Sequence, residues 1–206
     1  CVEQPAADGP RVSVYGEAQI CDSVRKIATN VDWDCEVITL FRKNNLGCKK
    51  AIVGAINWFF DNEEQGIILE DDIRPNKSFF EFCSKALTHF EDDERIMTIG
   101  GHSLIELPNQ TDKFRLSMYP EIWGWATWKN RWEKFDKSMK GWNSIYKSKK
   151  KRLIYFSDHY SNKFYPDRIQ SVKEGKDSSW AYTWDYTLRI NHGLNITPKK
   201  NTVAGG

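Results

Sequence analysis

The chain has 206 residues, of which 40% are hydrophobic and 28% are charged, a balance typical of soluble globular proteins with one domain and its own core. The formal net charge of +2 gives no reason to expect a nucleic acid partner, and no apolar run reaches the ~20 residues of a membrane span. The five cysteines include no C-x-x-C pair, which argues against a zinc site and a disulfide framework. We expect most of them to be small buried residues in a reducing compartment.

The first half of the chain, residues 1–101, alternates strand-like and helix-like segments. In chain order we expect a weak strand or loop at 11–19, then a helix at about 17–30 and a strand at 35–42. A helix at 48–62 and a strand at 66–70 follow. The last two elements of this half are a helix that is capped by Asn76 and runs to about Phe90, and a strand at 95–101. This alternation predicts an α/β fold with βαβ units and a mostly parallel sheet, in which ligands bind at the carboxyl ends of strands.

The second half, residues 102–206, is rich in aromatic residues and less regular. We expect helices near 129–136 and 145–157. The basic run at 147–152 is typical of a solvated helix face, and the alternative is a surface for an anionic acceptor or a lipid headgroup. Nine tryptophans are present in the chain. Their surplus in this half fits either core packing or a surface on which sugars stack.

Three adjacent carboxylates, Glu70, Asp71 and Asp72, follow the expected buried strand "GIIL". Like charges this close repel unless a cation lies among them. Hard divalent cations such as Mg²⁺ and Mn²⁺ prefer carboxylate oxygens and leave positions open for phosphate. The triplet therefore indicates a metal–diphosphate site, and the alternative is an acidic turn that is simply solvated.

Several segments stand in order around this triplet: "ADGPR" (7–11), "RKNNLGC" (42–48), "EIWGWATWKNRW" (121–132) and "WDYTLRINHGLNITPKKN" (184–201). Together they resemble bacterial nucleotide-diphospho-sugar transferases of the GT-A fold. More distantly, they are similar to the inverting N-acetylglucosaminyltransferase I family. The resemblance covers nearly the whole chain, and it implies a GT-A-like sheet flanked by helices, with a nucleotide-binding and metal-binding half (1–101) and an acceptor-side half (102–206) in a single domain.

The resemblance also implies roles for particular residues. The donor nucleotide and its sugar would be bound by Asp8, Arg11, Arg42, Asn45, Glu70 and Asp71, and Asp72 would be the direct ligand of Mn²⁺ or Mg²⁺. The sugar and acceptor cleft would be walled by Trp123, Gly124 and Trp125. His102 follows an expected strand and could face the same cleft, whereas we expect surface or packing roles for His89, His159 and His192.

Asp185, in the "WDY" segment, is the candidate catalytic base. An inverting transferase needs one carboxylate to take the proton of the acceptor hydroxyl. The N-glycan family has an acidic pair after a tryptophan in this segment, whereas this chain has one aspartate. The alternative is an aspartate that interacts with a helix dipole.

The predicted function is therefore metal-dependent transfer of a sugar from a nucleotide donor, expected to be UDP-linked, to a hydroxyl of a glycan or lipid-linked glycan. Family members begin with one more strand and helix, so we expect the first βα unit to be absent here. That absence makes a non-catalytic sugar- or nucleotide-binding module the main alternative, followed by a nucleotidyltransferase or phosphohydrolase. We expect a cytoplasmic location, without a signal peptide or membrane span and with peripheral contact to the inner membrane face as an option.

Overall fold

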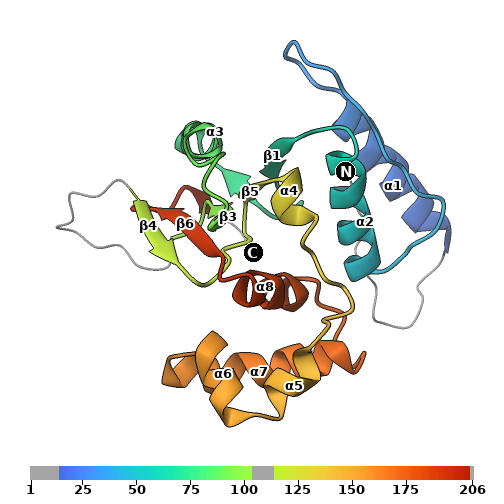
Figure 1. The fold of residues 1–206 in the computed structure, drawn as a ribbon. Helices are drawn as coiled ribbons and strands as arrows, with labels where there is room; N and C mark the ends of the chain where they lie inside the picture. The colour runs from blue at the N-terminus through green and yellow to red at the C-terminus, as the bar shows by residue number, and fades with distance from the viewer. Residues whose placement is uncertain (1–13, 104–113, 205–206) are drawn as a thin grey trace. The chain divides into compact units, whose positions relative to one another are not determined.

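The computed structural model describes residues 14–103 and 114–204 (Figure 1). The chain divides into two compact units, with the boundary between Trp58 and Phe59 in the last turn of a helix. No helix within the described residues is both long and apolar enough to cross a membrane.

The first unit contains two helices, α1 (Val14–Thr29) and α2 (Cys48–Phe60), close to where the hydrophobic periodicity predicts them. The helix α1 begins within the segment expected to be a weak strand or loop. The prediction of a strand at 35–42 is wrong, because this segment is neither helix nor strand. Val37, Ile38 and Phe41 are 42%, 54% and 41% exposed. A β-branched segment becomes a strand only where a neighbouring strand accepts its backbone hydrogen bonds, and none of the described residues do so here.

The second unit is built on a mixed five-stranded sheet, which confirms the α/β class. The strand order is β1 (Gln65–Ile68), β5 (Trp125–Trp128), β3 (Ile96–Gly100), β6 (Leu194–Pro198) and β4 (Phe114–Ser117). Only β3 and β6 are parallel neighbours, and the other three pairs are antiparallel. The expectation of a mostly parallel sheet is therefore wrong. Although β1 and β3 run in the same direction, β5 from the second half of the chain lies between them.

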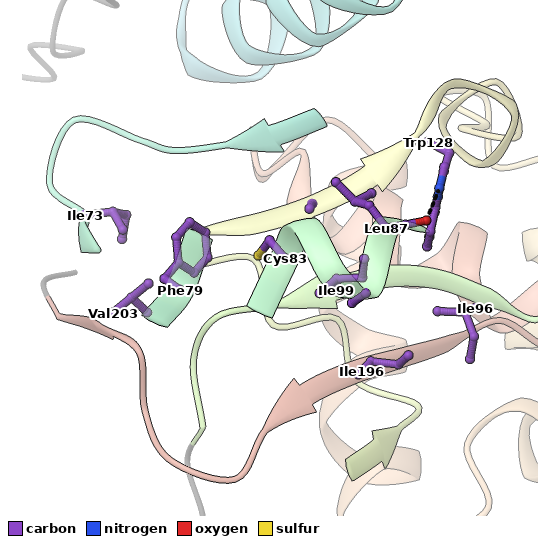
Figure 2. Close-up of a cluster of buried hydrophobic side chains, with 11 residues drawn as sticks. Ile73, Phe79, Cys83, Leu87, Ile96, Ile99, Trp128, Ile196 and Val203 are labelled. Carbon is purple, nitrogen blue, oxygen red and sulfur yellow. Dashed lines mark hydrogen bonds between the residues drawn. The ribbon is translucent and has the colours of Figure 1, made fainter. Parts of the chain in front are cut away.

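Helix α3 (Lys77–His89) covers one face of this sheet, as Figure 2 shows. Its predicted N-cap is confirmed, because the side chain of Asn76 accepts a hydrogen bond from the backbone N–H of Phe79 at 3.1 Å. Phe79 and Cys83 are completely buried against the sheet. Burial of one such aromatic side chain contributes about 1.5–3 kcal/mol. At the far end of the helix, the indole N–H of Trp128 donates to the carbonyl of Leu87 at 3.2 Å.

The opposite face of the sheet packs on tryptophans of helix α8 (Ala181–Ile190) and its N-cap. Side chains alternate along β5, so Trp128 faces α3 and Trp125 points the other way. Trp125 is fully buried, with ring centroids 5.8 Å from Trp180 and 5.9 Å from Trp184. Six of the seven tryptophans after residue 102 are buried, and only Trp123 is exposed. Core packing therefore accounts for most of the tryptophan surplus.

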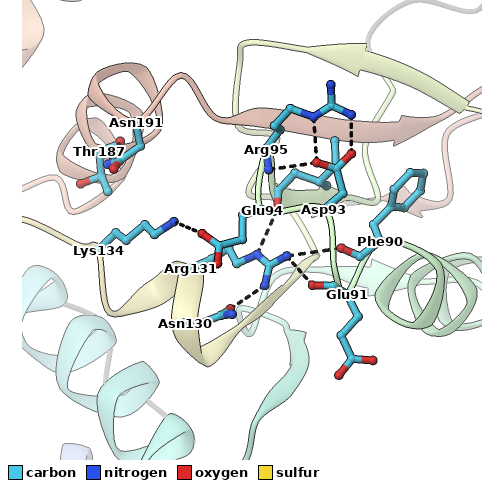
Figure 3. A network of polar contacts seen from close by, with 11 residues as sticks. Phe90, Glu91, Asp93, Glu94, Arg95, Asn130, Arg131, Lys134, Thr187 and Asn191 are labelled. Carbon is cyan, nitrogen blue, oxygen red and sulfur yellow. Dashed lines mark hydrogen bonds and ion pairs between the residues drawn. The ribbon is translucent and has the colours of Figure 1, made fainter.

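A buried arginine in the short helix α4 (Lys129–Trp132) ties the end of α3 to the start of β3 (Figure 3). The guanidinium of Arg131 donates to the backbone carbonyls of Glu91 at 2.6 Å, Phe90 at 3.3 Å and Ile96 at 3.3 Å. Carbonyls at the end of a helix have no partner within the helix, and this side chain supplies donors to two carbonyls at the end of α3. The helix expected at 129–136 is thus a single turn.

A layer of three helices packs beneath α8: α5 (Trp142–Tyr146), α6 (Lys149–Tyr155) and α7 (His159–Lys173) (Figure 1). The single helix expected at 145–157 is two helices, because Ser148 is extended and caps α6 by accepting from the N–H of Lys151. The helix α7 and the strands β4, β5 and β6 have no counterpart in the sequence-based expectations.

The expectation that most cysteines are buried is wrong for the described ones. Cys83 alone among them is buried, and its burial raises the pKa of its thiol to about 12. His89, His159 and His192, for which we expect surface or packing roles, are all exposed.

Candidate functional site

The candidate site lies where three strands of the mixed sheet meet at one edge. Both β1 and β3 run antiparallel to β5, so their carboxyl ends lie beside the start of β5. The register is specific, since Ile68 at the end of β1 and Gly100 at the end of β3 both pair with Trp125. The segments next to these positions form what we call the strand-end site, which comprises Glu70, Asp71, Asp72, His102, Glu121, Trp123 and Gly124.

Backbone hydrogen bonds fix the segments that form this site. The N–H of Gly101 donates to the carbonyl of Gly124 at 2.8 Å, and the N–H of Thr202 donates to the carbonyl of Gly101 at 3.1 Å. The strands β2 (Arg74–Pro75) and β7 (Val203–Ala204) pair beside them as a second, two-stranded sheet. The turn that carries the acidic triplet is therefore connected to the segment after β6.

Glycines at the site allow this close packing. Gly124 has a φ of +69°, a left-handed conformation that favours glycine. A Cβ atom there would lie 2.9 Å from Val203 and 3.3 Å from Ile73. A Cβ atom on Gly100 would lie 2.6 Å from the Cβ of Glu121, so the position of Glu121 depends on the absence of a side chain at Gly100.

The acidic triplet occupies a turn at the end of β1, with the N–H of Ile73 donating to the carbonyl of Glu70 at 3.2 Å. Glu70 is half-buried, and Asp71 and Asp72 are exposed. Burial raises the pKa of Glu70, and the nearby charges of Asp72 and then Asp71 raise it further. Within the described residues, no basic side chain forms an ion pair with these three carboxylates. A bound cation would relieve this repulsion.

A search of residues 14–103 and 114–204 finds no group of three or more His, Cys, Asp or Glu side chains arranged to hold a metal ion. Magnesium in nucleotide-binding sites is commonly held by one or two carboxylates, and substrate phosphates and water complete its coordination. The exposed carboxylates of Asp71 and Asp72 match that simpler donor set. The turn thus offers two carboxylates, and a cation bound there would need its other ligands from a substrate or from water.

On the other side of β5, a histidine and a glutamate face each other beside an exposed tryptophan. Oε2 of Glu121 lies 3.6 Å from Nδ1 of His102, and their side chains are 12% and 21% exposed. The His102 ring stands edge-on to Trp123, with centroids 5.0 Å apart. Trp123 is 45% exposed. The group thus combines an aromatic surface with two ionisable side chains.

The environment of Glu121 favours its protonated form. Burial raises the pKa of its carboxyl, and the nearby His102 and Arg115 act in the opposite direction. Arg115, on β4, donates from Nη2 to the hydroxyl of Ser103 at 2.9 Å. Sequence reasoning missed Glu121 and Arg115. Glu121 could have been found from its position directly before the "IWGW" segment, but nothing in the local sequence singles out Arg115.

Two other predicted site residues, Asp185 and Trp125, are buried. Asp185 is buried in α8, where Oδ2 accepts from Nε of Arg189 at 2.9 Å and both side chains are at most 3% exposed. Burial raises the pKa of Asp185, against the opposing charge and hydrogen bond of Arg189. Trp125 is fully buried, so of the two tryptophans in "WGW" only Trp123 has surface available to a ligand.

The remaining predicted donor-binding residues, apart from Glu70 and Asp71, belong to the first unit or lie outside the described residues. Arg42 donates from Nη1 to the carbonyl of Ala51 at 2.9 Å, on helix α2. The side chain of Asn45 accepts from the N–H of Gly47 at 2.7 Å, in the turn before that helix. Asp8 and Arg11 fall within residues 1–13, outside the described part of the chain.

In comparisons with known proteins, no family model matches the chain and no curated protein matches it.

Proposed function

We propose that this protein is a metal-dependent glycosyltransferase with a GT-A-like fold. It would transfer a sugar from a UDP-linked donor to a hydroxyl of a glycan or lipid-linked glycan, with inversion at the anomeric carbon, on the cytoplasmic side of the membrane. The observation that carries the proposal is the strand-end site, where an acidic turn lies on one side of β5 and a histidine–glutamate pair with an exposed tryptophan lies on the other. In α/β folds, ligands bind at the carboxyl ends of strands.

The acidic turn is the proposed donor side of the site. Asp72, with Asp71 beside it, would hold Mn²⁺ or Mg²⁺ together with the donor diphosphate. When bound, the cation would neutralise negative charge on the departing diphosphate. The half-buried carboxyl of Glu70 has a raised pKa, and it is suited to hydrogen bonds with a hydroxyl of the ribose or the sugar.

The pair of His102 and Glu121, on the opposite side of β5 from the acidic turn, is the proposed acceptor side of the site. The exposed face of Trp123 offers an apolar surface against which a sugar ring can lie. Two carboxylates are candidates for the base that takes the proton of the acceptor hydroxyl. Asp185 is the candidate from the sequence resemblance, whereas Glu121 is the candidate from the geometry, because it lies at the strand-end site and carries a raised pKa.

One observation favours a second function, a sugar- or nucleotide-binding module without turnover. The carboxylate of Asp185 is buried and ion-paired with Arg189, so an acceptor hydroxyl cannot reach it in this conformation. If Asp185 is the required base, this arrangement would allow binding and prevent transfer.

Calorimetric titration of UDP and UDP-N-acetylglucosamine into the full chain, with Mn²⁺ and again with EDTA, tests the proposal. We expect binding that requires the metal and is lost in Asp72→Asn. The matched control is Asp92→Asn, the same substitution in an exposed turn after α3, which should bind as the wild type does. Binding that is insensitive to EDTA and to Asp72→Asn would contradict the metal assignment.

A second measurement separates a transferase from its rivals. Release of UDP from one sugar donor in the presence of a glycan acceptor identifies a transferase. Metal-dependent binding without any product identifies the binding module, and release of phosphate from many different nucleotides identifies a phosphohydrolase.

A further inference from the structure

The corner between α6 and α7 exposes an unusual combination of apolar and basic side chains. We use the name α6–α7 corner for residues 149–163. Helix α6 has no buried residue, although it belongs to a packed helical layer. Leu153, Ile154 and Tyr160 are 45%, 59% and 64% exposed. Exposed apolar residues that occur singly need no explanation, but three within eight positions of one corner do.

The basic residues of the corner are arranged around these apolar side chains. Lys149 precedes Leu153 by four residues, and Lys150 precedes Ile154 by four residues. Residues four apart lie on the same face of a helix, so each lysine lies one turn before an exposed apolar side chain. Both lysines are exposed, and neither forms an ion pair within the described residues.

The basic residues of the corner outnumber its one acidic residue, Asp158. From Lys147 through Ser157, with both ends included, the chain has five basic residues and no acidic one. The carboxylate of Asp158 is occupied at the start of α7, where it accepts from the N–H of Ser161 at 2.8 Å and from the hydroxyl of Tyr119 at 2.8 Å. None of the five basic side chains forms an ion pair within the described residues, so their charge is available to an external partner.

We propose that the α6–α7 corner is a docking surface for an anionic lipid bilayer. Apolar side chains insert shallowly at the boundary between headgroups and acyl chains, while neighbouring lysines extend toward the lipid phosphates. Basic residues near an anionic leaflet each add to the binding free energy. A surface for a soluble polyanion would need the lysines but not Leu153 and Ile154, and for this reason we favour the bilayer. The inference does not depend on the proposed glycosyl transfer.

Cosedimentation of the full chain with vesicles tests this surface. Vesicles of phosphatidylcholine alone are compared with vesicles that also contain phosphatidylglycerol, at about 0.1 M and about 1 M salt. We expect binding to the anionic vesicles only, and we expect it to weaken at high salt because the charges are screened. Equal binding to both vesicle types, or no binding to either, would overturn the proposal without any substitution.

Paired variants then locate the contact. Lys149→Glu/Lys150→Glu should weaken binding about tenfold or more. Lys77→Glu/Lys85→Glu changes the net charge equally on the exposed surface of α3 and should have little effect. Leu153→Ser/Ile154→Ser should also weaken binding, because the apolar insertion is lost. Unchanged binding in both corner variants, or binding to heparin without binding to vesicles, would assign the surface to something other than a bilayer.

Discussion

Glu121 and His102 face each other at the ends of neighbouring strands, with Oε2 of the glutamate 3.6 Å from Nδ1 of the imidazole. The two residues are far apart in the sequence, but the antiparallel pairing of β3 with β5 brings them together. His102 Nδ1 is buried and has no hydrogen-bond partner among the described residues. A buried polar atom without a hydrogen bond costs free energy, and such atoms are common at sites that a ligand completes.

We expect Glu121→Gln to lower the rate of sugar transfer about 100-fold or more if Glu121 is the base, because the amide cannot accept the proton. Binding of the nucleotide should be unchanged. The control is Glu133→Gln, at an exposed position after α4. A transfer rate in Glu121→Gln close to that of the wild type would return the role of base to Asp185.

The pH profile tests the same pair. Burial raises the pKa of Glu121, and the active form of a base is deprotonated, so activity should fall as the pH decreases through this raised pKa. The charge of His102 opposes the effect of burial. His102→Asn should therefore shift the acidic limb of the profile to higher pH. If the acidic limb of the profile lies at the same pH in His102→Asn as in the wild type, Glu121 and His102 are not coupled.

Asp185→Ala should destabilise the fold by about 3 kcal/mol, because the charge of Arg189 would remain buried without its partner. Nη1 of Arg189 also donates to the carbonyl of Tyr155 at 2.8 Å, and Cζ of Arg189 lies 4.5 Å from the centre of the Phe156 ring. The guanidinium therefore cannot simply move into solvent. Urea denaturation measures the change. Asp185→Leu combined with Arg189→Met should restore much of the stability. Unchanged stability with complete loss of transfer would instead identify Asp185 as the base.

Gly124→Ala should cost about 2–4 kcal/mol, because it combines a left-handed backbone conformation with overpacking against Val203. Gly175→Ala provides a matched control. Gly175 has a φ of +74° and nothing lies within 4 Å of its added Cβ, so only the backbone cost of about 1 kcal/mol should appear. The comparison requires the free energy of unfolding of each variant. Equal losses would mean that the space around Gly124 adjusts without cost.

The N-cap of α7 should make stability depend on pH. The Ser161 hydroxyl and backbone N–H, together with the Tyr119 hydroxyl, lower the pKa of Asp158 to about 2. The stabilisation is thus complete above the unfolded pKa of about 4 and is lost as the pH falls toward 2. At neutral pH, Asp158→Ala should cost about 1 kcal/mol. The difference from the wild type should shrink between about pH 4 and pH 2 in urea titrations. A constant difference would show that the charge of Asp158 plays no part in the cap.

The local sequence predicted elements whose signals are contained within one segment. Asn76 predicts the start of the helix Lys77–His89, and a short apolar run predicts the strand before the acidic triplet. The segment at 35–42 shows the limit of this reasoning. Its β-branched residues predict a strand, but a strand also needs a partner that the local sequence does not specify.

Local sequence patterns are enough to predict the α/β class, the cap of α3 and the position of the acidic triplet after a strand. Long-range strand pairing places β5 between β1 and β3, and this arrangement makes the sheet mixed and brings Glu121 to His102. The tertiary structure also decides that Trp123 is exposed while Trp125, two residues later, is buried. The physical reason is that strand pairing and burial depend on residues far apart in the chain, whereas caps and periodicity depend on neighbours.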